Sequence, residues 1–176
     1  AQVNQKLDVP YLAVHVGFVP HDPKVARYTT MVDRVRDLCD KLGEMGLTLV
    51  METGQETAEA LLAFIDAIDR GNVGVNFDPA NMILYGVGDP GKAVTLLKDR
   101  IVHVHMKDAT WSDQPGKSWG EEIVLGTGDA NIPQIVSQLN AQGYTGLLAI
   151  EREAGDQRVA DIQQAITLLE SLGCQR

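Results

Sequence analysis

Short runs of β-branched and other apolar residues alternate along this chain with amphipathic stretches of helical period. The alternation repeats five times, and each apolar run has the length of a single strand. Strands that alternate with helices favour a parallel sheet with right-handed crossover connections. The fold class is therefore α/β. The expected strands cover residues 11–16, 47–52, 73–77, 101–105 and 147–150.

The helices are indicated by apolar spacing and by capping residues. Apolar residues in the stretch 25–42 recur at intervals of three and four, which predicts one buried helix face. Thr57, Asp89 and Asn131 stand where further helices begin, as expected for side chains that cap free backbone amides. The last helix is expected over residues 159–172. Its inward residues are expected to be Ile162, Ile166 and Leu169.

Two architectures contain such units, namely an open doubly wound sheet and part of a closed barrel. A dinucleotide-binding sheet requires a glycine-rich turn after its first strand, whereas residues 17–20 read Gly-Phe-Val-Pro. No composition shift divides the chain, so we expect a single domain over residues 1–176. The segment 107–130 is expected to be a long polar loop that either closes over a substrate or stays exposed.

Composition argues against several classes of function. The net charge of −9 repels phosphodiester backbones, so no nucleic-acid partner is expected. No apolar run approaches the roughly 20 residues that span a bilayer, so no membrane partner is expected. Two cysteines, Cys39 and Cys174, are too few for a disulfide framework, which favours a cytoplasmic location.

Four of the expected strands end in a polar residue or are directly followed by one at their carboxyl ends. Buried carboxylates cost several kcal/mol unless they are paired or coordinated, and the carboxyl edge of a parallel barrel is where active sites form. Three carboxylates and one imidazole suit Mn²⁺ or Mg²⁺, with Co²⁺ or Zn²⁺ as alternatives. The predicted metal ligands are Glu52, Asp78, His105 and Glu151.

Further polar residues lie near the same edge. His103 and His105 share one face of their strand, and His105 is nearer the carboxyl end, so we expect His103 to be a hydrogen-bonded core residue. Lys107 continues that face and either reaches a substrate oxygen or is solvated. The candidates for substrate binding are His15, Asn81, Lys107 and Asp108.

Several motifs resemble one known family. They are LVME at 49–52, GVNFDPANM at 74–82, VHVHMKD at 102–108, GTGD at 126–129, GYTG at 143–146 and IERE at 150–153. Together they resemble the last four strands of the sugar phosphate isomerase/epimerase superfamily, the xylose-isomerase-like TIM barrel group. The resemblance implies a TIM (β/α)8-type barrel whose strands 4 to 8 are present and whose first three βα units are missing.

A complete barrel of this type needs roughly 250 residues. We therefore expect this chain of 176 residues to be a piece of a longer protein. The alternative is a self-contained protein that covers its open sheet edges by association, for example as a homo-oligomer.

The resemblance also implies a chemistry. Glu52, Asp78, His105 and Glu151 would bind a divalent metal, and Glu52 and Glu151 would act as an acid/base pair. The expected reaction is isomerisation or epimerisation of a sugar, sugar phosphate or related hydroxy-carbonyl compound through an enediolate. Alternatives are inosose dehydration, hydroxypyruvate isomerisation, or a truncated fragment without activity.

Two departures from the family pattern narrow this expectation. Ketohexose epimerases of the group carry a histidine where this chain has Asn81, and an arginine where it has only Lys107 and Asp108. The related AP endonucleases use several more histidines than the four present here. The sequence thus argues against a ketohexose 3-epimerase and against DNA repair.

Overall fold

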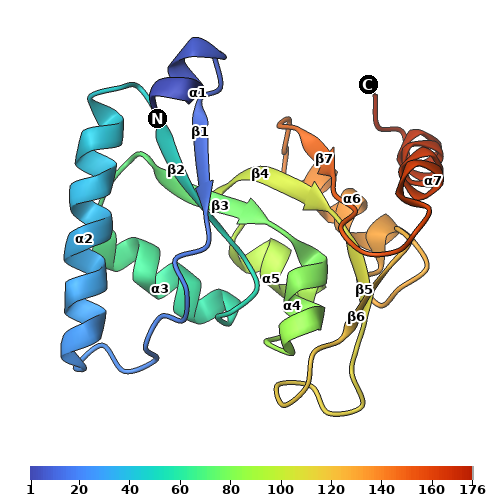
Figure 1. Ribbon diagram of the computed structural model, residues 1–176, viewed down its shortest axis with the longest axis horizontal. Coiled ribbons are helices and arrows are strands. Elements are labelled where there is room, and N and C mark those ends of the chain that lie inside the picture. Colours follow the sequence, from blue (N-terminus) through green and yellow to red (C-terminus); the bar gives the residue numbers. More distant parts are fainter. Residues whose placement is uncertain (176) are drawn as a thin grey trace.

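A five-stranded parallel sheet forms the frame of the molecule (Figure 1). The computed structural model describes residues 1–175. The strands lie side by side in chain order, which makes the sheet a half-barrel of consecutive βα units. They are β1 (Tyr11–Val14), β2 (Thr48–Glu52), β3 (Val73–Phe77), β4 (Ile101–Met106) and β7 (Leu148–Ile150).

Helices connect the strands and cover one face of the sheet. Thr57 and Asp89 cap their helices as predicted, accepting hydrogen bonds from the backbone amides of Ala60 and Lys92. Asn131 precedes its helix in a left-handed conformation, but its side chain makes no capping hydrogen bond. The helices are α1 (Gln2–Lys6), α2 (Ala26–Gly43), α3 (Ala58–Ile68), α4 (Pro79–Tyr85), α5 (Pro90–Leu96), α6 (Ile132–Ala141) and α7 (Arg158–Ser171).

The two faces of the sheet differ because side chains alternate along each strand. The face toward the helices is apolar, and each such side chain stabilises the fold by about 1.5–3 kcal/mol when fully buried. The opposite, concave face carries Glu52, Asn76 and His105, which share one parity across the register of the central strands. The residues fully buried beneath the helices include Leu49, Met51, Val75, Phe77, Val104 and Met106.

Two elements lie where the sequence predicted only loop. Helix α4 begins directly after β3, because Asp78 caps it and Pro79 occupies its first turn. Within the expected polar loop, β5 (Asp108–Thr110) and β6 (Glu121–Ile123) pair as an antiparallel hairpin. Both elements are too short for a clear hydrophobic period.

The predicted strand ends shift by one or two residues. β1 ends at Val14, where its pairing with β2 stops. His15 and Val16 therefore lie outside the ladder. In α7 the buried residues are Ala165 and Leu169, whereas Ile162 is exposed, which corrects the predicted inward face. Among the described residues, no helix is long and apolar enough to cross a membrane.

Candidate metal centre

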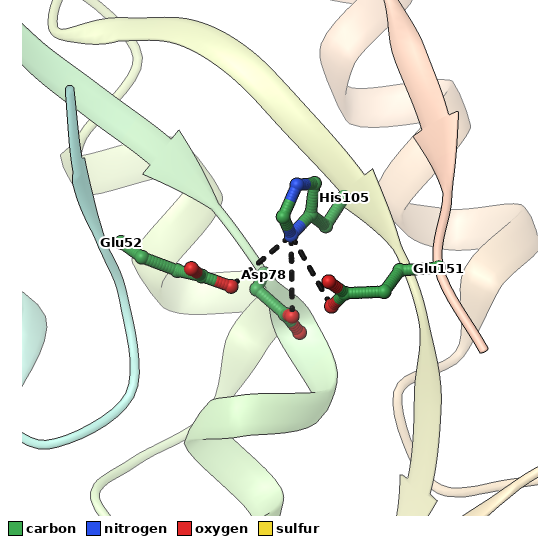
Figure 2. A group of neighbouring side chains, drawn as sticks. All are labelled: Glu52, Asp78, His105 and Glu151. Carbon is green, nitrogen blue, oxygen red and sulfur yellow. Dashed lines mark hydrogen bonds and ion pairs between the residues drawn. The ribbon is translucent and has the colours of Figure 1, made fainter. Parts of the chain in front are cut away.

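Four side chains from four different segments meet at the carboxyl edge of the sheet (Figure 2). Each offers one ligand atom, and the four atoms lie within 4.8 Å of one another. His105 Nδ1 lies 3.1 Å from Glu52 Oε1, 3.3 Å from Glu151 Oε2 and 3.8 Å from Asp78 Oδ2. The structure thus brings together the four predicted metal ligands.

Strand register explains this meeting. Glu52 ends β2 and pairs with Asn76, so Asp78, two residues further on, lies on the same face at the edge. His105 lies on the same face of β4, and Glu151 follows β7, its amide bonded to the Met106 carbonyl. The four groups converge because parallel strands end at one edge.

Asp78 is anchored most firmly. Its backbone and the Thr53 hydroxyl are joined by two hydrogen bonds of 2.7 and 2.8 Å, and its Oδ1 accepts from the Asn81 amide at 3.0 Å. Its Oδ2 is buried and has no hydrogen-bond partner among the described residues. A buried carboxylate oxygen without a hydrogen bond is costly, and a cation would satisfy it.

The electrostatics of the cluster are those of an anionic pocket. Burial raises the pKa of Asp78 to about 6. Burial opposes protonation of His105, but the carboxylates of Asp78, Glu151 and Glu52 outweigh it and raise the pKa of His105 to about 11. Hydrogen bonding to His105, assisted by Lys107, lowers the pKa of Glu151 to about 2.

This donor set fits a divalent cation. Three carboxylates and one imidazole supply hard oxygen ligands and one nitrogen ligand. Without an ion, the positive charges beside the three carboxylates are a proton on His105 and the Lys107 ammonium. A divalent cation would neutralise the carboxylates further and satisfy Asp78 Oδ2. The residues present therefore fit the metal that the sequence suggested.

Two of the predicted substrate contacts touch Glu52. His15 Nε2 lies 3.2 Å from Glu52 Oε2, and the His15 side chain is 43% exposed. Asn81 Nδ2 donates to Glu52 Oε1 at 3.0 Å, and Asn81 is buried. Both residues border the cluster, and each contacts a different carboxylate oxygen of Glu52.

Lys107 is buried rather than solvated. Its Nζ donates to Glu151 Oε2 at 3.0 Å and to Glu153 Oε2 at 2.5 Å, and its side chain is 3% exposed. Burial opposes its charge, but these carboxylates outweigh burial and raise the pKa of Lys107. Lys107 thus lies beside the cluster as a positive partner of Glu151.

Asp108 has a structural role in place of the substrate contact that we expected. Its two carboxylate oxygens accept hydrogen bonds from the amides of Ala109, Gly126, Gly128 and Ala130. The residue is 1% exposed. Its hydrogen-bonding capacity is therefore spent on closing the loop between β4 and α6.

Sequence reasoning missed several polar residues around the cluster. Asn76 lies between both histidines, with its Oδ1 2.9 Å from His103 Nδ1 and its Nδ2 3.2 Å from His105 Nε2. Its parity with Asp78 was the available signal. His103 is half-buried and hydrogen-bonded, as expected for a supporting histidine. Glu122 and Arg152 carried no comparable signal, because their partners are distant in sequence.

Comparison with known proteins places this geometry in a family. The model of the xylose isomerase-like TIM barrel family matches residues 1–172. The chain belongs to this family. The family match covers all the described strands, including those that carry the cluster.

Individual relatives agree with this assignment. A xylose isomerase domain protein from Planctomyces limnophilus shares 39% identity with a TM-score of 0.91, and the match covers 97% of this chain and 60% of that one. An uncharacterized protein of Methanocaldococcus jannaschii is 26% identical over 84% of this chain and 52% of its own length. The chain thus spans about half the length of the curated relatives it matches.

More distant structures share the fold. A D-tagatose 3-epimerase-like protein is 22% identical with a TM-score of 0.72, covering 98% of this chain and 66% of that one. A xylose isomerase-like protein from Mycobacterium smegmatis, solved in complex with magnesium, is 22% identical with a TM-score of 0.69, covering 88% and 54%. At this identity the likeness concerns the fold alone.

Proposed function

We propose that this chain carries the metal centre of an isomerase or epimerase that acts on a sugar or another small hydroxy-carbonyl compound. The observation that carries the proposal is the cluster of four ligand atoms within 4.8 Å. Family membership supports the reaction class, since its structural neighbours include an epimerase-like protein. The magnesium complex of another neighbour supports a divalent cation, and Mn²⁺ is the second candidate.

The two glutamates are proposed as the acid/base pair. Figure 2 shows Glu52 and Glu151 on opposite sides of the site, with Asp78 and His105 between them. A substrate carbon held between the carboxylates could lose a proton to one of them and regain a proton from the other. Bound there, a divalent cation would act as a Lewis acid that stabilises the negative charge developing on the substrate oxygen.

The surrounding residues prepare both carboxylates for this role. The pKa of Glu52 is lowered, because its hydrogen bond with His105 and the charges of His105 and His15 together outweigh burial. The Lys107 ammonium keeps Glu151 oriented at 3.0 Å. Both glutamates are therefore ionised near neutral pH, which is the form in which a carboxylate can take up a proton. His15, Asn81 and Lys107 are proposed to contact substrate hydroxyl groups as well.

A thermal melt with excess Mn²⁺, compared with the same protein in EDTA, tests the metal centre. A ligand that binds only the folded state stabilises it by about 2.7 kcal/mol at 100 times its Kd, which we expect as a clear rise in Tm. The same experiment with Mg²⁺ ranks the two ions. An unchanged Tm with both ions would contradict the proposal and favour a fragment without activity.

A substrate panel then separates the reactions that share this first step. Sugar isomerisation, inosose dehydration and hydroxypyruvate isomerisation all begin with removal of a proton beside a carbonyl. Exchange of that proton with deuterated solvent, followed by NMR, reports the step whatever the product. Exchange in the wild type but not in Glu151→Gln would support the assigned acid/base role.

A further inference from the structure

Glu122 is a buried carboxylate outside the metal cluster. It lies on β6 of the hairpin, and its side chain is only 7% exposed. The hairpin continues from the carboxyl end of β4 and lies next to α4 in Figure 1. A carboxylate in this position requires partners, and they come from the segment that follows β7.

The backbone after Glu151 is the first partner of Glu122. Glu122 Oε1 accepts hydrogen bonds from the amide of Glu153 at 2.9 Å and from the amide of Ala154 at 3.2 Å. Oε2 accepts from the Ala154 amide at 3.3 Å. The hairpin is thus hydrogen-bonded to the backbone two and three residues beyond the metal ligand Glu151.

Two cationic side chains also contact Glu122. Arg152 Nη1 donates to Glu122 Oε1 at 2.7 Å, and Arg152 Nε donates to Asp161 Oδ2 on α7 at 2.9 Å. Lys107 Nζ lies 3.7 Å from Glu122 Oε2 and 3.0 Å from Glu151 Oε2. One carboxylate therefore holds both the segment and the lysine that orients Glu151.

Regular structure alone holds this segment weakly. β7 has three residues, all half-buried, and among the described strands it pairs only with β4. The ladder leaves residues 151–154 outside, apart from the single bond between the Glu151 amide and the Met106 carbonyl. Polar contacts from the hairpin must supply the remaining constraint.

We propose that Glu122 is a positioning residue for the metal ligand Glu151. The inference rests on the proposed metal centre and adds to it a supporting residue from the hairpin. Outer partners that orient metal ligands typically change metal affinity by 10–100-fold when they are replaced. Glu122 acts on Glu151 through the backbone of residues 152–154 and through Lys107.

The test compares Glu122→Gln with Glu121→Gln in the full chain. Glu121 is the exposed neighbour on the same strand, so the control removes an equal charge from the same hairpin. We expect calorimetry to show Mn²⁺ binding roughly 10-fold or more weaker in Glu122→Gln and unchanged in Glu121→Gln. Equal Mn²⁺ affinity in Glu122→Gln and the wild type would overturn the proposal.

A double variant separates positioning from general loss of structure. If Glu122 acts through Glu151, adding Glu122→Gln to Glu151→Gln should weaken Mn²⁺ binding little further, because coupled residues are not additive. Full additivity of the two effects would overturn the proposal. Should Glu122→Gln fail to fold, Glu122→Asp keeps the charge and shortens the reach, and we expect several-fold weaker Mn²⁺ binding; wild-type affinity would overturn the proposal.

Hydrogen exchange supplies a readout that needs no metal. In EDTA, the amides of Glu153 and Ala154 should exchange faster in Glu122→Gln than in Glu121→Gln, because the neutral amide oxygen of glutamine accepts a hydrogen bond more weakly than the carboxylate does. Equal exchange rates in the two variants would show that Glu122 does not hold these two amides. Absence of both Mn²⁺ and Mg²⁺ binding in the wild type, with protected amides, would instead overturn the metal centre and leave Glu122 with only a structural role.

Discussion

The central strands and the terminal strand β7 hold their metal-ligand candidates in different ways. All five residues of β3 are buried, and Asp78 follows β3 into a helix cap fixed by Thr53 and the Asn81 amide. The three residues of β7 are half-buried, and Glu151 depends on Lys107 and on the hairpin. Core packing thus places one side of the site, whereas polar contacts place the other.

This difference teaches how a partly open sheet can still carry an ordered site. Apolar packing is dense and non-directional, so it fixes strands that have neighbours on both sides. An edge strand has less apolar surface to bury and relies on directional hydrogen bonds. Substitutions in the two regions should therefore fail in different ways.

The largest expected effect is in the centre. Phe77→Ala empties a fully buried position of β3 and should lower the free energy of unfolding by about 3–5 kcal/mol. Leu148→Ala on β7 removes a half-buried side chain and should cost only about 1–2 kcal/mol. Urea unfolding of both variants in EDTA measures the contrast, and equal losses would break the comparison.

The next effect concerns the metal. At 100 times the wild-type Kd, the stabilisation by Mn²⁺ of about 2.7 kcal/mol should disappear in Asp78→Asn. It should be reduced in Glu151→Gln, because the edge ligand is less firmly fixed. Asp66→Asn, an exposed control on α3, should keep the full rise in Tm. A full rise in Asp78→Asn would contradict the predicted ligand set.

A smaller effect is expected from the ion pair behind β7. Asp161→Asn leaves Arg152 with one carboxylate partner in a site where both side chains are about one-tenth exposed, and should cost about 1–2 kcal/mol. Asp66→Asn breaks the exposed pair with Arg100 and should cost less than about 1 kcal/mol. Thermal melts in EDTA compare the two, and a larger loss in Asp66→Asn would reverse the expected order.

The smallest effect concerns Glu56, a buried carboxylate that accepts from the Val19 amide at 3.1 Å and so joins the segment after β1 to the segment between β2 and α3. Burial raises its pKa above the ordinary 4.5. As pH rises, the Glu56 carboxyl group therefore ionises in the unfolded chain before it ionises in the folded protein. The free energy of unfolding falls over this range of pH, because the folded protein still holds the proton. Glu56→Gln lacks this loss.

We therefore expect the Tm of Glu56→Gln to gain slightly on that of the wild type as pH rises from about 4 to 8. Melting curves of both proteins in EDTA across this range measure the difference. A difference in Tm that is constant with pH would show that Glu56 keeps an ordinary pKa in the folded protein.

Much of the fold could be predicted because its determinants are local. The period of the helices, the caps at Thr57 and Asp89 and the apolar strands are encoded within a few residues each. Cys39, placed on an apolar helix face, is fully buried. Prediction from local patterns also explains why short elements were missed. α4 and the β5–β6 hairpin contain too few residues to show a hydrophobic period.

The sequence by itself determined which residues stand at the carboxyl ends of the strands, because alternation along a strand and parallel pairing bring equivalent positions to one edge. Glu52, Asp78, His105 and Glu151 could therefore be grouped in advance. Only the tertiary structure decided how they are supported. Lys107 meets Glu151 across 44 residues and Arg152 meets Glu122 across 30, and such contacts depend on how the hairpin and β7 pack together.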